Sequence, residues 1–220
     1  MDEAGSMRKL FRVKVCGITN LADARIALDA GADALGFNFC RQSPRYISPA
    51  RALRIIRRLP GNLAIVGVFV NRSPASIDRI ARRLRLDFIQ LHGEEPPKEI
   101  VALAGTHRVI RVLRVPPRFR PAALRNYSGV TAFMLDGYRR KARGGTGRPF
   151  DWRLARQAAR FGPVILAGGL NPGNVARAIR IARPTAVDVA SGVESRPRKK
   201  DAALVRAFVD QAKRAFLELR

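Results

Sequence analysis

The chain has 220 residues, and 47% of them are apolar, so it is long enough for a substantial core and too apolar to be a disordered polymer. No uninterrupted apolar run reaches the roughly 18–20 residues of a membrane span, and the acidic N-terminus lacks the apolar segment of a signal peptide. Lysine and arginine number 42 against 17 acidic residues, a formal net charge of +25, which suggests either a nucleic-acid surface or solvated basic helices. With only two cysteines, we expect a cytoplasmic protein.

Residues 1–9 are predicted to be an N-terminal extension or a tag remnant, and residues 10–220 a single domain. In this domain short β-branched runs alternate with amphipathic stretches. The pattern predicts strands at residues 11–15, 34–39, 64–70, 88–91, 108–112, 131–135, 164–167 and 186–190. It predicts helices at residues 21–29, 49–58, 74–83, 97–104, 121–125, 152–161, 172–180 and 200–219, the fifth with the weakest pattern.

These elements make eight strand–helix units of about 25 residues each, the size expected of a (β/α)8 TIM barrel in one α/β domain. Most of the strands are apolar at consecutive residues, as strands covered on both faces of a parallel sheet require. An open, doubly wound sheet would instead favour a GxGxxG sequence after the first strand, and none occurs there. In a barrel, the functional face lies at the carboxyl ends of the strands.

The arginines recur at helical spacing opposite apolar residues. In RALRIIRRL, residues 51–59, the apolar side chains fall on one helical face and Arg51, Arg54 and Arg58 on the other. IDRIARRLRL and VARAIRIAR repeat this pattern, so we place the arginines on the outer faces of separate helices. We therefore predict no specific nucleic-acid partner, although so large a charge should attract polyanions nonspecifically.

Several residues that can do chemistry stand at the predicted strand ends. Cys16 follows the first strand and Asp136 the sixth, while Arg45 lies in the loop after the second. A lone cysteine is most often a small buried residue, and a lone aspartate is most often a helix cap. A thiol and a carboxylate that face one pocket, however, can act as the base and the acid of one reaction. Arg45 could bind a carboxylate in a bidentate pair. His92 could serve in acid–base chemistry, although a hydrogen-bonded structural histidine is the commoner case, and the sequence offers no cluster of metal ligands.

Glycine-rich turns follow the seventh and eighth strands, in AGGLNPGNV and ASGVES. Turns of this kind present backbone N–H groups to an anion, and in eight-fold barrels this position typically binds phosphate. A single glycine more often serves a tight turn, but two such turns at these two positions favour a phosphate site. Its candidate residues are Gly168, Gly169, Ser191 and Gly192. The GGTG sequence at residues 144–147 is equally typical of a flexible loop.

The strand-end sequences, in this order, resemble those of the phosphoribosylanthranilate isomerases of tryptophan biosynthesis. The resemblance runs through KVCGIT, GFNF…SPRYIS, VGVFVN, IQLHGEE, LD…GGTGRPFDW, LAGGLNPGNV and VDVASGVES…KD, which together span nearly the whole chain. KVCGIT and GGTGxxFDW are the most specific of these. Because phosphate-binding barrels catalyse many reactions, these sequences and not the fold carry the assignment.

The resemblance implies an Amadori rearrangement of N-(5-phosphoribosyl)anthranilate to 1-(2-carboxyphenylamino)-1-deoxyribulose 5-phosphate. It makes Asp136 the general acid that protonates the furanose ring oxygen, and Cys16 the general base that removes the C2 proton. It makes Arg45 the residue that binds the anthranilate carboxylate, and the two glycine-rich turns the phosphate grip. No cofactor or metal is implied, the partner is a small phosphosugar, and the protein is expected to be a monomer or a homodimer.

The thiol of Cys16 leads to two further expectations. A base acting near neutral pH must be a thiolate, whereas free cysteine has a pKa of about 8.5, so we expect the basic pocket and the cationic imine of the reaction to lower the pKa of Cys16. Cys40 ends the neighbouring second strand, and oxidation could join it to Cys16 if their Cα atoms come within roughly 7 Å. The alternative is that Cys40 points elsewhere.

Two residues depart from the pattern of the family. Arg198 stands in SRPRKKD where family members usually carry glycine, and this change could alter the start of the last helix. Asn38 replaces an apolar residue in GFNF and is expected to put a polar group near the barrel wall.

Two other functions stay open at this point. The aminoaldose isomerases of histidine biosynthesis share the barrel and the chemistry but rely on two carboxylates, so Cys16 argues against them. A non-catalytic, basic RNA-binding barrel would require one continuous arginine surface and would tolerate the replacement of Cys16 by alanine.

Overall fold

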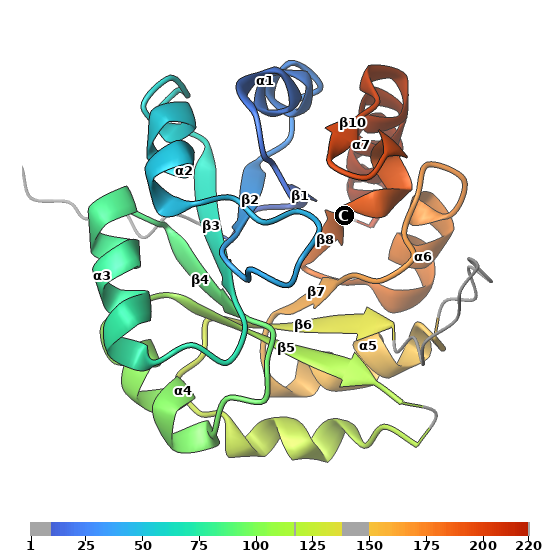
Figure 1. Cartoon of the computed structure of the whole chain (residues 1–220). Coiled ribbons are helices and arrows are strands. Elements are labelled where there is room, and N and C mark those ends of the chain that lie inside the picture. Colours follow the sequence, from blue (N-terminus) through green and yellow to red (C-terminus); the bar gives the residue numbers. More distant parts are fainter. Residues whose placement is uncertain (1–9, 117, 138–149, 220) are drawn as a thin grey trace, which may run out of the picture.

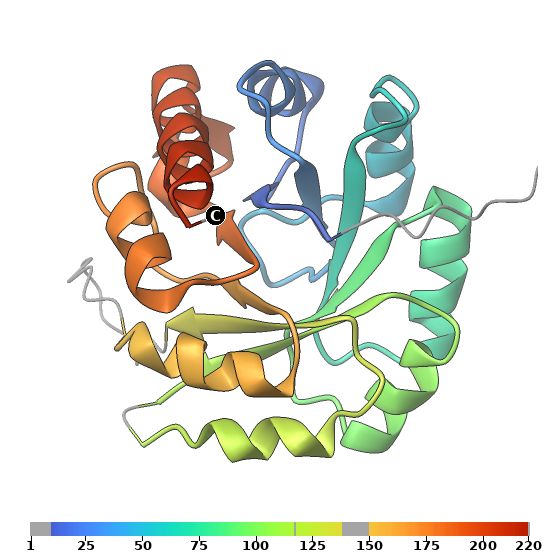
Figure 2. The same ribbon diagram turned by 180° about the vertical axis from the view of Figure 1, so that it is seen from behind.

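Eight parallel strands form a closed barrel in the order β1-β2-β3-β4-β5-β6-β7-β8, with β8 paired to β1 (Figure 1). The structure is a computed structural model, and it describes residues 10–116, 118–137 and 150–219. The predicted N-terminal extension and the GGTG sequence at residues 144–147 lie outside the described residues. Helices surround the barrel in both views (Figures 1 and 2), which confirms the predicted (β/α)8 fold.

The observed strands lie within a few residues of those predicted. The largest differences are that β1 begins later and includes Cys16, and that β5 and β6 continue beyond their predicted ends. Cys16 and Asp136 therefore belong to strands, so the alternation of the strand sets the direction of each side chain. The strands are β1 Val13–Cys16, β2 Ala34–Asn38, β3 Ala64–Phe69, β4 Phe88–Leu91, β5 Val109–Val115, β6 Ala132–Gly137, β7 Val164–Leu166 and β8 Ala186–Val189.

Capping residues explain where several of the helices begin. Asn20, Ser48 and Asp201 each accept a hydrogen bond from a backbone N–H in the first turn of the helix that follows, and proline opens three further turns at the first or second helical position. The helices are α1 Leu21–Asp29, α2 Pro49–Ile56, α3 Pro74–Leu84, α4 Pro97–Ala104, η1 Pro121–Asn126, α5 Arg153–Ala158, η2 Ala159–Phe161, α6 Val175–Ala182 and α7 Ala202–Leu217, where η marks 3-10 helices.

Four of the predicted helices differ from the observed ones; the helix predicted at 152–161 is α5 followed by the 3-10 helix η2. The predicted helix at 121–125 is the 3-10 helix η1. The helix predicted at 172–180 begins at Val175, because the side chain of Asn174 accepts the N–H of Asn171 and holds the preceding residues in a turn. The helix predicted at 200–219 begins at Ala202, because the chain first forms the 3-10 helix η3 (Ser191–Val193) and a hairpin of β9 (Glu194–Arg196) and β10 (Lys199–Lys200).

The interior of the barrel is apolar toward the amino ends of the strands and polar toward their carboxyl ends. Phe11 and Phe88 pack edge to face there, with ring centroids 5.5 Å apart, within an apolar cluster that fills the barrel. The next inward-facing residues of three strands are polar and buried: Lys14, Gln90 and Asp188. A larger apolar cluster lies between the barrel and the helices. The barrel is therefore closed at one end and lined with polar groups toward the other.

The arginines lie where their spacing predicts. In α2 the side chains of Ala52 and Ile55 are buried, whereas Arg51 and Arg54 are exposed. α3 and α6 repeat this division; α2 and α3 are neighbours, whereas α6 lies on the other side of the barrel (Figures 1 and 2). The arginines of each helix consequently lie on its own outer face. Among the residues that the structure describes, no helix is both long and apolar enough to cross a membrane.

Candidate active site

A cavity of about 510 Å³ opens at the carboxyl ends of the strands. Both the predicted thiol and the predicted carboxylate face it, and so do both glycine-rich turns. All of the predicted site residues line it, namely Cys16, Arg45, Asp136, Gly168, Gly169, Ser191 and Gly192. The barrel thus brings together residues that the sequence spreads over nearly 180 positions.

Cys16 ends β1, and its side chain is buried at the floor of the cavity. Burial raises the pKa of its thiol above the ordinary value, although the cations of Lys14 and Lys200 pull that pKa downward. Our expectation that the basic pocket lowers the pKa of Cys16 is therefore wrong for the ligand-free protein. Desolvation has the larger effect on this pKa, because removing a thiolate from water costs more free energy than its attraction to the two lysines provides.

Asp136 lies one residue before the end of β6, and its side chain is 26% exposed to the cavity. His92, which follows β4, places its Nε2 atom 3.3 Å from Oδ2 of Asp136. The structure places His92 on the wall of the cavity beside the carboxylate, and the acid–base role weighed from the sequence stays a prediction. Its position directly after a strand was the available signal.

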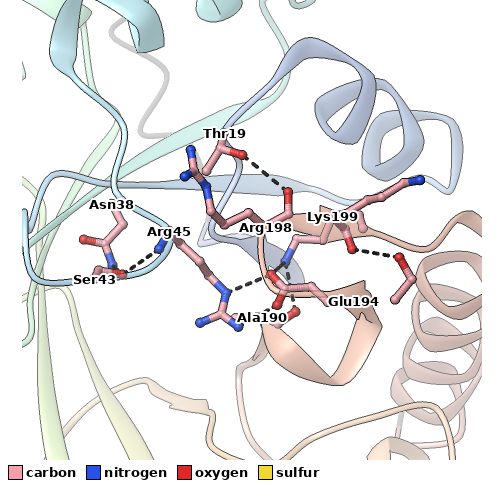
Figure 3. A network of polar contacts seen from close by, with 10 residues as sticks. Thr19, Asn38, Ser43, Arg45, Ala190, Glu194, Arg198 and Lys199 are labelled. Carbon is pink, nitrogen blue, oxygen red and sulfur yellow. Dashed lines mark hydrogen bonds and ion pairs between the residues drawn. The ribbon is translucent and has the colours of Figure 1, made fainter.

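Arg45 projects from the loop after β2 and forms a bidentate pair with Glu194 (Figure 3). Its Nε and Nη2 atoms donate to the two carboxylate oxygens at 2.7 and 2.6 Å. Asn38 organises this loop, because its side chain donates to Ser43 and accepts the N–H of Cys40. The polar residue expected near the barrel wall therefore has a structural task, which is to hold the loop that carries Arg45.

Glu194 connects Arg45 to a buried lysine of the β9–β10 hairpin. The Nζ atom of Lys200 lies 3.0 Å from Glu194 and donates to the carbonyl oxygen of Ala190 at 2.9 Å. Burial raises the pKa of Glu194, but the hydrogen bond from Arg45 and the charge of Lys200 outweigh it, so the pKa of Glu194 is lowered overall. Glu194 is therefore a carboxylate held between two cations.

The glycine-rich turns after β7 and β8 approach each other closely. Gly168 has a φ of +79°, which favours glycine, and a side chain there would collide with the backbone of Gly137 next to Asp136. A side chain at Gly192 would collide with the carbonyl group of Leu170. Among the described residues, no acceptor is found for the backbone N–H groups of Gly168, Gly169, Ser191 and Gly192. These N–H groups can therefore bind an anion beside Asp136.

Arg198 lies in the turn of the β9–β10 hairpin and not at the start of the last helix. The predicted effect on that helix is thus wrong, since α7 begins four residues later behind the cap of Asp201. Arg198 has a φ of +72°, in the left-handed region where glycine is favoured. The carbonyl oxygen of Arg198 is within 3.5 Å of the hydroxyl of Thr19, which ties the hairpin to the β1–α1 loop (Figure 3).

Replacing Arg198 by glycine is expected to raise the free energy of unfolding by about 0.5–1 kcal/mol, because the backbone strain of a left-handed arginine is removed. The backbone contact with Thr19 is retained, and the Arg198 side chain is exposed. Urea unfolding of the two proteins measures the change. The matched control is Arg196→Gly in strand β9, which should lower the free energy of unfolding. Equal destabilisation by both variants would contradict the prediction.

Cys16 and Cys40 are both free thiols. The Sγ atom of Cys40 donates to Oε1 of Gln42 at 3.0 Å, and Cys40 is not among the residues that line the cavity. The oxidative link between the two cysteines stays a prediction.

Sequence reasoning missed several polar residues at or near the site, which are Gln90, Arg114, Asp188, Glu194 and Lys200, together with Lys14 below the cavity. A charged or amide side chain inside an otherwise apolar strand was the signal for Lys14, Gln90 and Asp188, because such groups are buried only with partners. Glu194 and Lys200 offered no comparable signal, since they lie in a hairpin that the sequence pattern did not predict.

Comparisons with known proteins agree with this geometry. The family described as N-(5'phosphoribosyl)anthranilate (PRA) isomerase matches residues 13–211. The N-(5'-phosphoribosyl)anthranilate isomerase of Geobacter sulfurreducens is 51% identical over 204 residues, which cover 93% of this chain and 99% of that protein. A crystal structure of phosphoribosyl anthranilate isomerase in complex with reduced 1-(o-carboxyphenylamino)-1-deoxyribulose 5-phosphate is 42% identical, with a TM-score of 0.82 and coverage of 93% and 99%. Monomers generated from the dimeric enzyme of Thermotoga maritima are 39% identical, with a TM-score of 0.79 and the same coverage.

Proposed function

The chain belongs to the N-(5'-phosphoribosyl)anthranilate isomerase family and isomerises this aminoaldose in tryptophan biosynthesis, and we propose that Cys16 and Asp136 carry its two proton transfers. The observation that supports these roles is that a thiol from β1 and a carboxylate from β6 face one cavity, which two glycine-rich turns also line. Acid and base thus reach a single phosphosugar from different strands of the barrel.

The reaction begins at Asp136, which donates its proton to the furanose ring oxygen. The C1–O bond breaks, its electrons go to that oxygen, and the lone pair of the anthranilate nitrogen forms a cationic imine with C1. Cys16 as thiolate then removes the proton at C2, and the C–H electrons neutralise the imine to give an enolamine. Tautomerisation of the enolamine yields the ketone. The cationic imine itself acidifies the C2 proton, so the steps can proceed without an external electron sink.

The two charged ends of the substrate suggest how it is oriented. The phosphate would bind the N–H groups of Gly168, Gly169, Ser191 and Gly192, and the anthranilate carboxylate would bind Arg45 at the other side of the cavity. Glu194 occupies the Nε edge of the Arg45 guanidinium. The Nη1 atom of Arg45 is engaged by none of the described residues, so it is available to a substrate carboxylate.

Replacing Arg45 by lysine is expected to raise KM for the anthranilate substrate about 10- to 100-fold, since an ammonium cannot bind two carboxylates in the bidentate geometry of a guanidinium. kcat should change less, because Arg45 binds a group that does not react. Steady-state kinetics separate the two constants. Arg79→Lys, on the exposed face of α3, is the control that should leave both unchanged. A fall in kcat at constant KM would contradict the role of Arg45.

The activity is tested by measuring turnover of freshly generated N-(5'-phosphoribosyl)anthranilate by the wild-type chain. The loss of substrate fluorescence reports the turnover. The aminoaldose of histidine biosynthesis, which lacks the anthranilate carboxylate, serves as the second substrate and should be converted poorly. A folded protein that converts neither substrate would overturn the assignment. An RNA-binding barrel would in that case be tested by titration with RNA at two salt concentrations.

The setting of the enzyme is proposed from the same observations. Two free thiols at and near the site suit the reducing cytoplasm. Residues 10–220 are proposed to act as one isomerase domain, with residues 1–9 as an extension. The similarity to monomers generated from a dimeric isomerase supports assembly as a monomer or a homodimer.

A further inference from the structure

Directly beneath Cys16 lies a buried lysine that the proton transfers above do not use. Lys14 precedes Cys16 by two residues on β1, so both side chains point into the barrel. The residue that pairs with Cys16 on β2 is Gly36. A Cβ atom there would lie 2.6 Å from Sγ of Cys16 and 3.1 Å from Cε of Lys14. The absent side chain of Gly36 therefore leaves the space in which the thiol and the lysine approach each other.

Lys14 is a fully buried ammonium held by a carboxylate. Its side chain has no exposed surface, and its Nζ atom lies 2.6 Å from Oδ1 of Asp188 on β8. Burial favours the neutral amine, but the charge of Asp188, followed by that of Cys16, raises the pKa of Lys14 above its ordinary value. Lys14 consequently keeps its proton at neutral pH. A buried ion pair of this kind is weak evidence for stability and invites a functional reading.

The charges around Cys16 are unbalanced while its thiol is neutral. The cations Lys14, Lys200 and Arg45 are joined to only two carboxylates, those of Asp188 and Glu194. Ionisation of Cys16 supplies the third anion, so the thiolate neutralises the cluster. Across the cavity the other charged or titratable groups that face Cys16 are His92, Arg114 and Asp136, which come from the ends of β4, β5 and β6.

We propose that Lys14 is a positioning residue whose buried ammonium stabilises the thiolate form of Cys16 from beneath, on the side away from the cavity. The proposal rests on Cys16 being the base of the proposed reaction. Lys14 is not among the residues that line the cavity, so it acts without touching the substrate. Asp188 does line the cavity and anchors Lys14 across the β1–β8 seam. When Cys16 ionises, its thiolate therefore has a counter-charge that the substrate cannot displace.

The rate at which iodoacetamide alkylates Cys16, measured against pH, tests the proposal. All proteins carry Cys40→Ser, so that Cys16 is the sole thiol. Lys14→Met should raise the alkylation midpoint by about 1–3 pH units, because the counter-charge of the thiolate is lost. Asp188→Asn should lower the midpoint, because Asp188 opposes ionisation of Cys16. Lys213→Met, which removes an exposed lysine of α7, is the matched control and should shift nothing.

A general loosening of the site would move the alkylation midpoint in the same direction in both variants. Opposite shifts of the midpoint in Lys14→Met and Asp188→Asn therefore cannot come from such loosening. If Lys14→Met does not fold, the double variant Lys14→Met/Asp188→Asn removes both buried charges, and its midpoint should lie above that of Asp188→Asn. An unchanged midpoint in Lys14→Met, or shifts in the same direction from both single variants, would overturn the proposal.

The kinetics distinguish this inference from the proposed function. With Cys16 as base, the acid limb of kcat/KM against pH should move with the alkylation midpoint in each variant. If Cys16→Ala keeps full activity, the proposed base fails and the catalytic role of Lys14 falls with it. If Cys16→Ala is inactive but the midpoints do not move, Cys16 remains the base and the role of Lys14 alone is overturned.

Discussion

Replacing Cys16 by alanine is expected to lower kcat for N-(5'-phosphoribosyl)anthranilate by about 10³- to 10⁴-fold, the upper part of the range for loss of a general base. Cys16 is the thiol at the floor of the cavity, and an alanine side chain has no atom that can accept the C2 proton. The loss should appear in kcat with little change in KM, because a proton-transfer group acts mainly in the transition state.

Cys40→Ser is the matched control for this variant. Cys40 bonds to Gln42 outside the cavity, and serine retains a donor of similar size, so activity should be kept. A substrate labelled with deuterium at C2 adds a second readout. Exchange of that deuterium with water should stop in Cys16→Ala, even if the variant still opens the sugar ring. Continued exchange at the wild-type rate would mean that another group removes the C2 proton.

The pH dependence of the wild-type enzyme follows from the same thiol. Because burial raises the pKa of Cys16 in the ligand-free protein, only a minor part of the enzyme carries the thiolate at neutral pH. kcat/KM should therefore rise with pH through the neutral range, by up to about tenfold per unit, and level off above the raised pKa. The cationic imine, which forms only after ring opening, does not enter this free-enzyme limb.

Replacing Asp136 by asparagine is expected to lower kcat by about 10²- to 10⁴-fold, since the amide has almost the same shape but is no practical acid. Asp136 lines the same cavity as Cys16 and lies beside His92 and the turn at Gly168. Asparagine has almost the same size as aspartate and can keep these contacts, so the fold should be preserved. The loss of activity should then come from the missing proton donor. Without the acid the ring should not open.

Deuterium exchange at C2 again separates the two steps. It should be lost in Asp136→Asn, because exchange requires the open imine. Asp210→Asn, on the exposed face of α7, removes a carboxylate of the same kind and should leave kcat unchanged. An Asp136→Asn enzyme with wild-type kcat would assign ring opening to another acid, of which His92 is the neighbour in contact.

Much of the site could be predicted from positions along the chain. The period of the strand and helix patterns predicts eight units, and the general rule that barrel sites lie at the carboxyl ends of strands selects Cys16, Arg45 and Asp136. The glycine turns were predicted for the same reason, and the cavity contains all of them. Their location at the cavity could be predicted because it depends on local periodicity and on the order of elements, both of which are properties of short segments.

The tertiary structure alone decided which charged groups meet. Lys14 and Asp188 are 174 residues apart and Arg45 and Glu194 are 149, and each pair forms only when the barrel closes or the hairpin folds over its edge. The direction of the pKa shift of Cys16 was likewise out of reach, because burial and charge act in opposite directions and their balance depends on packing. Sequence by itself determined the barrel and the strand-end positions of the proposed acid and base. The fold determined the charges around them, since electrostatic energies depend on distances and desolvation in three dimensions.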